Sequence, residues 1–173
     1  SSSDPDIVVA IEDAAGMVDA LLAGAAEHPV EVVGGSADLA RSYIAVANTN
    51  GVAYGMDRTV AAVSLEAIRE QSTGYEFDAS PFRADIDARS VGEEAAALAA
   101  RSLGGSEVAT GRYDVVLSPV AAASILGQVI LPALSGRNVK AGRSFLADKV
   151  GEQVFDETLS VYDDPFAPGL GST

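Results

Sequence analysis

The longest run without a charged residue, residues 115–136, limits what this chain can fold into more than any other feature. Ser118 and Pro119 are typical of an N-cap and a first helical residue, and the apolar pattern behind them predicts a helix over 119–135 with Gly136 as its C′ residue. Such a helix is about 25 Å long, shorter than the ~30 Å hydrocarbon core of a bilayer. We therefore expect a helix covered by protein and not a membrane span.

The chain carries 25 acidic and 11 basic residues, which gives a net charge of −14. An acidic surface repels phosphate backbones and anionic lipids, so we expect neither nucleic acid nor membrane as a direct partner. The acidic residues are spread along the whole sequence, which favours a halophilic protein whose self-repulsion is screened by high salt. A surface that binds a basic partner is the alternative.

Cysteine and histidine, which often act in catalysis or bind metals, are scarce in this chain. There is no cysteine, and His28 is the single histidine, so disulfides, thiolate catalysis and a multi-histidine metal site are excluded within this chain. His28 lies where the first helix is expected to end, which favours a partner of the helix dipole over a catalyst. The N-terminal SSSDPD is unlike a signal peptide and indicates a cytoplasmic protein, cut from within a longer one.

A first helix is predicted between Asp4 and Pro29. Asp4 is suited to the N-cap, Pro5 to the first helical position, and Pro29 ends the pattern. Apolar residues at three- and four-residue spacing define its expected buried face: Ile7, Ile11, Ala14, Val18, Leu21, Leu22 and Ala25. Because aromatics make up only 6% of the chain and Trp is absent, the core must consist of small and branched aliphatic side chains.

Four β-prone runs follow and predict an antiparallel meander with one face on the first helix. They are VEVV at 30–33, ARSYIAVAN at 40–48, VAYGMDRTVAAVSLEAI at 52–68 and YEFDAS at 75–80. Asn50-Gly51, between the second run and the third, indicates a hairpin with a type I′ turn, in which both central residues have positive φ.

A second helix is expected to begin at Ser90, with Glu93 completing a capping box, and to end at Gly104-Gly105. Glu93 and Glu94 then serve the helix terminus and are not an acid/base pair, since adjacent helical residues do not face each other. Its predicted apolar face comprises Val91, Ala95, Leu98, Ala99 and Leu103. GRYDVVLSP, at 111–119, predicts a strand with a buried VVL centre before the uncharged helix. The fold class is therefore α+β, an antiparallel β-meander packed with helices, plus a strand–helix unit that begins a second region.

The segment from YDVVLSP through ALSG, KAGRSFL and KVGEQV to DDP resembles the TldD/PmbA family, known as modulators of DNA gyrase and regarded as metalloproteases. ANTNGV and EEAAALAARSLG occur upstream in the family's order, and the likeness is closest to the PmbA (TldE-like) branch. The resemblance implies an internal fragment, with 1–110 as a middle α+β domain. Residues 111–173 would then be the truncated start of the C-terminal, protease-like domain.

Active members of this family carry HExxxH, in which two histidines bind zinc and the glutamate is the general base. Aligned on the strand before and the glycine after, these positions fall on Gly127, Gln128 and Pro132. None of the three can bind zinc as histidine does or accept a proton at neutral pH. The resemblance therefore implies a chain without catalytic residues, metal or cofactor, which is inactive by itself.

The expected function is that of a non-catalytic, PmbA-like subunit in peptide proteolysis. Its partners would be a TldD-like catalytic subunit, or a second copy bound through the uncharged helix, together with unfolded peptides. The alternative is a stand-alone module that binds a peptide or small ligand, and a weaker one is catalysis by carboxylates alone. As for a metal site, Asp163-Asp164 indicates a solvated turn more than metal binding, and Asp85 and Asp87 are weaker metal candidates still.

Overall fold

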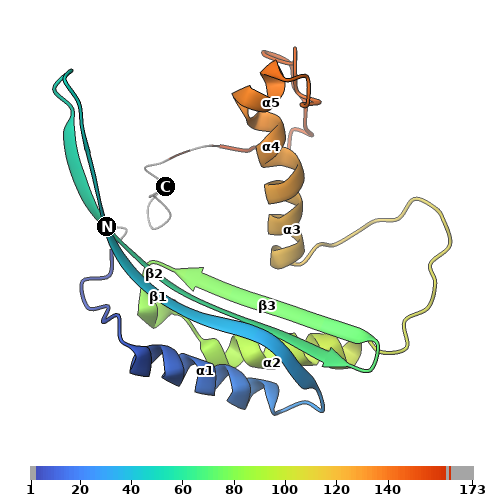
Figure 1. Ribbon diagram of the computed structural model, residues 1–173. Coiled ribbons are helices and arrows are strands. Elements are labelled where there is room, and N and C mark those ends of the chain that lie inside the picture. Colours follow the sequence, from blue (N-terminus) through green and yellow to red (C-terminus); the bar gives the residue numbers. More distant parts are fainter. Residues whose placement is uncertain (1–2, 163, 165–173) are drawn as a thin grey trace. The chain divides into compact units, whose positions relative to one another are not determined.

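The computed structural model describes residues 3–162 and residue 164. They fall into two compact units, one comprising the residues up to Val108 together with residue 164, and one that begins at Ala109 and contains the remaining described residues. Each unit is described by itself. The first contains α1 (Ile11–Ala25), β1 (Glu31–Ala47), β2 (Ala53–Arg69), β3 (Ser72–Ser80), the 3-10 turn η1 (Arg83–Asp85) and α2 (Ala88–Arg101). The second contains α3 (Pro119–Ile125), the π-turn η2 (Leu126–Ile130), α4 (Leu131–Leu134) and α5 (Gly136–Lys140) (Figure 1).

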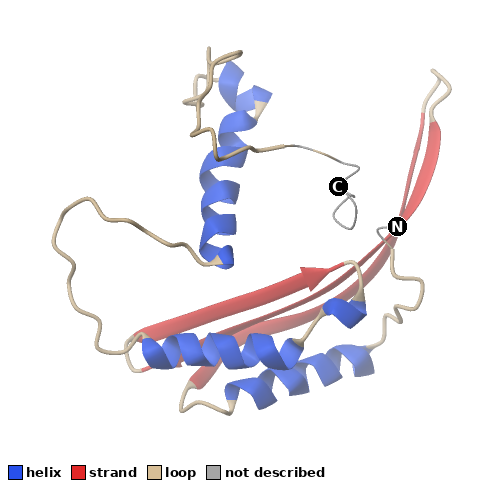
Figure 2. Cartoon of the chain, turned by 180° about the vertical axis from the view of Figure 1, so that it is seen from behind, coloured by secondary structure: helices blue, strands red, loops and turns tan. Residues whose placement is uncertain are grey.

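The first unit is a three-stranded antiparallel sheet, in the order β1-β2-β3, covered on one face by two helices. Figure 2 shows α1 and α2 side by side beneath the strands. Alternate residues of β2, from Thr59 to Ala67, are buried against the helices, as the period of two in a strand requires. The predicted α+β meander packed with helices is confirmed.

The core is made of small side chains, and the helices come very close together. A Cβ atom on Gly24 of α1 would overlap the carbonyl oxygen of Arg89 in α2, and a Cβ on Gly92 of α2 would overlap the carbonyl oxygen of Leu21 in α1. Gly74 of β3 faces the backbone of α2 in the same way, at Ala95. Glycine is therefore required at these three positions, where α1, α2 and β3 meet.

The predicted start of the first helix is wrong, because Asp4 is not its N-cap. α1 begins at Ile11, and Asp4 is buried, with its backbone N–H donating to Thr59 Oγ1 at 2.7 Å. The Asp4 carboxylate accepts from the backbone N–H groups of Asp6 and Arg83, each at 3.0 Å. These bonds tie the N-terminal segment to the sheet and to the turn before α2, so it does not coil into the helix.

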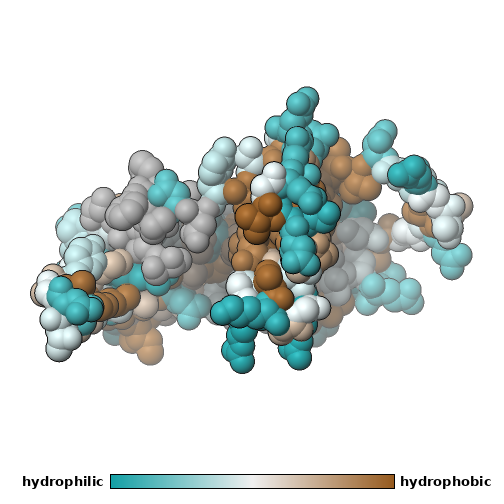
Figure 3. All heavy atoms as spheres, turned by 90° about the horizontal axis from the view of Figure 1, so that it is seen from above, coloured by the Kyte–Doolittle hydropathy of each residue, from teal (hydrophilic) through white to brown (hydrophobic). Residues whose placement is uncertain are grey.

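The predicted buried face of α1 is only partly correct. Leu21 and Ala25 are buried, together with Met17 and Gly24, but the side chains of Ile11, Val18 and Leu22 are exposed. The reason is the close approach of the two helices, which turns the side of α1 that carries Gly24 toward α2. Figure 3 views the molecule from above, where brown apolar side chains lie among teal hydrophilic ones.

The predicted N-cap of the second helix is also wrong. α2 begins at Ala88, and the cap is Asp87, whose carboxylate accepts from the backbone N–H of Ser90 at 3.1 Å. Aspartate and serine are equally good N-caps, so the residue type does not explain why Asp87 is used. Asp87 is the cap because it directly precedes the first helical residue, Ala88. Val91, Ala95 and Ala99 are buried as predicted, whereas Leu98 and Leu103 are half-buried.

The hairpin at Asn50-Gly51 is confirmed, but its turn type is wrong. The Gly51 N–H donates to the Asn48 carbonyl at 3.3 Å, and only Gly51 has positive φ, at 87°. The Asn48 side chain accepts from the N–H groups of Asn50 and Val52, which stabilises a three-residue loop. The two β-prone runs before this loop form the single strand β1, with a bulge between Val32 and Gly34.

The strand predicted at 111–119 is not formed. Residues 106–118 contain no strand, and the side chains of Val115 and Val116 are 71% and 99% exposed. A strand exists only when it pairs, and the described residues offer this segment no partner. No helix within the described ranges is long and apolar enough to cross a membrane.

Candidate functional site

The helix that contains the positions of the family's metal motif begins as predicted. Ser118 is the N-cap of α3, and its Oγ accepts from the backbone N–H of Ala121 at 3.3 Å. Pro119 occupies the first turn, where a missing N–H costs nothing. The end differs from the prediction, because α4 stops at Leu134 and Gly136 is the first residue of α5 instead of a C′ residue.

A π-turn, η2, interrupts this helix just before Pro132. The N–H of Leu131 donates to the carbonyl of Leu126, five residues earlier. In an α-helix the same N–H would donate to the carbonyl four residues earlier. Pro132 has no N–H, and in an α-helix its ring would crowd the carbonyl of Gln128. The extra residue in the turn relieves this clash, so the chain stays helical through the proline.

The π-turn also changes which side chains share a face of the helix. At 3.6 residues per turn, residues five apart lie about 140° apart around an α-helix and cannot bind one ion together. The wider turn, with its bond between residues five apart, reduces this angle relative to an α-helix. The family's HExxxH motif has its two histidines five residues apart, at the positions that correspond to 127 and 132.

The side chains needed for that chemistry are missing. Gly127 has none, and a Cβ built on it would meet no atom within 4 Å. Gln128 and Pro132 are exposed, and neither offers a nitrogen lone pair or a carboxylate. Among residues 3–162 and 164, no group of three or more His, Asp or Glu side chains is placed to hold a metal ion. Whether the chain lacks zinc in solution stays a prediction.

Two polar side chains that the sequence reasoning missed hold the end of α4. Asn138 Nδ2 donates to the carbonyl of Pro132 at 2.8 Å, and Ser144 Oγ donates to the carbonyl of Ala133 at 2.6 Å. The last carbonyls of a helix have no partner within it, so these bonds fix its C-terminal end. Asn138 and Ser144 belong to the stretch RNVKAGRSFL, whose polar residues just after an apolar helix were the available signal.

The other residues considered from the sequence have structural roles or are not described. His28 lies in the turn after α1, where its N–H donates to the Ala25 carbonyl at 3.1 Å. Asp85 accepts from Ser80 Oγ at 2.7 Å, and Asp87 caps α2. The pair Asp163-Asp164 cannot be judged, since Asp163 lies outside the described residues.

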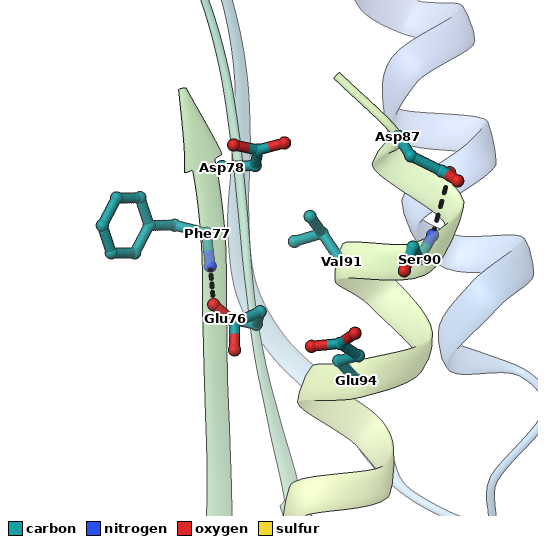
Figure 4. A pocket seen from close by; sticks show the side chains of 7 residues that line it. All are labelled: Glu76, Phe77, Asp78, Asp87, Ser90, Val91 and Glu94. Atoms are coloured by element: carbon teal, nitrogen blue, oxygen red, sulfur yellow. Dashed lines mark hydrogen bonds between the residues drawn. The ribbon is translucent and has the colours of Figure 1, made fainter. Parts of the chain in front are cut away.

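Four carboxylates surround a hollow of about 200 Å³ between β3 and α2 (Figure 4). Glu76 and Asp78 come from β3, while Asp87 and Glu94 come from the N-terminal turns of α2. Three of them accept backbone hydrogen bonds, from Phe77, Ala79 and Ser90 respectively. Local backbone hydrogen bonds therefore account for three of these four carboxylates.

One carboxylate of the second unit has a lowered pKa. A side-chain hydrogen bond and a backbone hydrogen bond from Thr158 lower the pKa of Asp156 below its ordinary value. The two residues form a fully exposed local turn, so this shift reports hydrogen bonding within the turn and not a reactive centre.

Comparison with known protein families matches both parts of the chain to one family. The central domain of the PmbA/TldA metallopeptidases matches residues 4–103, and the C-terminal domain of the same family matches residues 110–173. The chain belongs to this family. The earlier resemblance is thereby confirmed at family level, while the PmbA-like branch stays a proposal.

Individual relatives of the PmbA/TldA family cover most of the chain. The uncharacterized protein MJ0231 of Methanocaldococcus jannaschii is 30% identical over 77% of this chain and 31% of its own length. A metalloprotease of Methanothermobacter thermautotrophicus is 27% identical over 99% of this chain and 39% of its own length. The chain thus spans less than half of these two relatives.

Solved structures of family members share the fold. A putative modulator of a DNA gyrase from Thermotoga maritima has a TM-score of 0.83 at 22% identity, over 93% of this chain and 39% of the other. TldE from Thermococcus kodakarensis has a TM-score of 0.73 at 23% identity, over 98% of this chain and 40% of the other.

Proposed function

We propose that this chain is part of a PmbA-like, non-catalytic subunit of a TldD/PmbA-type metallopeptidase. The observation that carries the proposal is the helix α3–η2–α4, which has Gly127, Gln128 and Pro132 at the motif positions. Similarity to TldE and to a metalloprotease supports this assignment. The residues described supply the scaffold of a peptidase, and a TldD-like subunit would supply the zinc and the general base.

The division of the chain follows from the same proposal. Residues 1–110 would be the middle domain and residues 111–173 the start of the C-terminal, protease-like domain. The gap between the two matched ranges, which end at 103 and resume at 110, supports this division.

The proposed contribution to proteolysis is to hold unfolded peptide near the partner's active site. β3 is the better edge for strand addition, because β1 has a bulge between Val32 and Gly34 that distorts its end of the opposite edge. Tyr75 and Phe77 project from β3 with exposed rings 6.2 Å apart, which gives an extended peptide two apolar contacts. Peptide bound there should protect the free amides of β3 from hydrogen exchange.

Zinc content tests the proposal directly. After dialysis against zinc and removal of the excess, elemental analysis of the chain should find less than about 0.1 equivalent, since no ligand set is present on the helix. The chain alone should cleave no peptide, and activity should appear only when a TldD-like relative carrying HExxxH is added.

The matched control is the variant Gly127→His/Gln128→Glu/Pro132→His, which restores the motif on the same scaffold. Because this variant also removes Pro132, it should retain more zinc than the unchanged chain only if the helix keeps positions 127 and 132 on one side without the proline. One tightly held equivalent in the unchanged chain, lost in the variant His28→Ala, would contradict the proposal.

A further inference from the structure

The loop at the tip of the first hairpin contains an asparagine directly before a glycine. Residues 48–52 connect β1 with β2, and Figure 1 shows this connection beyond the end of β3. Asn50 and Gly51 are both exposed, and a Cβ built on Gly51 would meet no atom within 4 Å. The peptide bond between Asn50 and Gly51 is therefore surrounded by open space.

An asparagine side chain can react with the backbone nitrogen of the residue after it. The lone pair of the deprotonated Gly51 nitrogen attacks Cγ of Asn50, the bond from Cγ to the side-chain nitrogen breaks, and that nitrogen leaves as ammonia. Water then adds to one of the two carbonyl carbons of the resulting succinimide, the bond from this carbon to the ring nitrogen breaks, and the nitrogen takes up a proton. Opening at Cγ gives aspartate. Opening at the backbone carbonyl gives isoaspartate, whose main chain runs through Cβ and Cγ.

Hydrogen bonds hold the other two asparagines of the chain in place. The Asn48 side chain accepts from the backbone N–H groups of Asn50 and Val52, at 3.0 and 3.2 Å. Asn138 Nδ2 donates to the Pro132 carbonyl at 2.8 Å. In the part of the chain that the structure describes, the Asn50 side chain makes no hydrogen bond, so its Cγ is the one free to turn toward the next nitrogen.

The residue after each asparagine makes the same distinction. Asn48 and Asn138 precede Thr49 and Val139, whose β-branched side chains crowd the attacking nitrogen, whereas Gly51 has no side chain. The Val139 N–H is also held in α5, where it donates to a carbonyl at 3.0 Å. The Gly51 N–H donates at 3.3 Å, which is longer than the usual range of about 2.7–3.2 Å, so this bond is weak.

We propose that Asn50 is a site of spontaneous deamidation, at which the chain converts this residue to aspartate and isoaspartate without an enzyme. The reaction is intramolecular and needs only water, so it depends on the loop itself and not on a bound partner. It places a carboxylate in residues 42–56, a stretch without any charged residue, and changes the net charge of the chain from −14 to −15 (−14 − 1).

Isoaspartate would also change the shape of the hairpin. It adds one carbon to the main chain between residues 50 and 51. The Asn48 N–H donates to the Val52 carbonyl at 3.0 Å and closes the loop at its present length. A longer main chain no longer fits this bond, so the pairing of β1 with β2 should begin farther from the tip in the modified chain.

Incubation of the folded chain in mildly alkaline buffer tests the proposal. Tandem mass spectrometry of its peptides measures, at each asparagine, the mass gain that accompanies conversion of an amide to a carboxylate. Asn50 should convert at least about tenfold faster than Asn48 or Asn138, because reacting groups held out of position lose up to about 100-fold in rate. The rate should rise with pH, since the attacking nitrogen must lose its proton.

Two variants identify the reacting residue. Asn50→Gln keeps an amide in the loop but would have to close a larger ring, so position 50 should no longer convert. Asn138→Gln is the matched control, and Asn50 should convert in it at the unchanged rate. Isoaspartyl methyltransferase, which methylates isoaspartate and not aspartate, should label the incubated unchanged chain but not Asn50→Gln. In the labelled chain, the Asn48 N–H should lose protection from hydrogen exchange.

Three results would overturn the proposal. The three asparagines could convert at equal rates, so that neither the free side chain nor the following glycine matters. Asn50 could convert in urea but not in the folded chain, so that the loop protects it. Aspartate could form without isoaspartate, which would exclude the succinimide. None of these outcomes bears on the zinc test, so this inference and the proposed function fail separately.

Discussion

Single glycines set the distance between the helices of the first unit. Gly92 faces the Leu21 carbonyl so closely that no side chain fits, although alanine is the better helix former by about 1 kcal/mol. We predict that Gly92→Ala lowers the free energy of unfolding by about 1–3 kcal/mol, because the helices must move apart. Urea denaturation measures the loss.

Gly16 provides the control on the same pair of helices. A Cβ on Gly16 would meet no atom within 4 Å, so Gly16→Ala should raise stability by about 0.5–1 kcal/mol through helix propensity alone. If both substitutions changed the free energy of unfolding equally, the result would contradict the close approach of α1 and α2 at Gly92.

The turn between β2 and β3 contains a strained residue. Glu70 has a φ of 55°, a conformation that residues with a side chain rarely adopt, in the two-residue connection between Arg69 and Ser72. Glu70→Gly should raise the free energy of unfolding by about 0.5–1 kcal/mol in thermal denaturation. Gln71→Gly relieves no such strain and should slightly lower the free energy of unfolding. If Gln71→Gly were instead the more stable of the two variants, Glu70 would not be the strained residue.

At the scale of elements, the π-turn η2 is explained by one residue. Pro132→Ala restores the missing N–H and removes the ring, so residues 126–134 should return to α-helical hydrogen bonding. The amide protons of residues 130–133 should then show protection typical of a continuous helix in hydrogen exchange. If the π-turn persisted in this variant, the turn would not depend on the proline and the expectation would fail.

Helices and strands could be predicted where a local sequence pattern determines their position. They could not be predicted where contacts between residues distant in the sequence determine it. The helix beginning at Ser118, the hairpin at Gly51 and the α+β meander follow from caps, turn residues and periodicity. Asp4 has the sequence of an N-cap, but its partners Thr59 and Arg83 are more than 50 residues away. For the candidate site, the family resemblance located positions 127, 128 and 132, whereas the π-turn could not be predicted from the sequence, since a proline is also compatible with a kink.

At the scale of the whole molecule, net charge should govern stability. With a net charge of −14, we expect the melting temperature to rise by several degrees between dilute buffer and molar potassium chloride, as salt screens self-repulsion. Differential scanning calorimetry measures the shift. The triple variant Asp19→Asn/Glu93→Gln/Glu94→Gln, with a net charge of −11 (−14 + 3), should show a smaller salt dependence. A melting temperature that does not change with salt would instead favour a surface that binds a basic partner.

The contact between α1 and α2 also has a consequence during synthesis on the ribosome. α1 leaves the ribosome first, but its partner helix begins at Ala88, roughly sixty residues later. At about 5–20 residues per second, α1 waits about 3–12 seconds before it can bury its face. The residues that α1 buries are Met17, Leu21, Gly24 and Ala25, so only two large apolar side chains of this face are exposed to other chains during this interval.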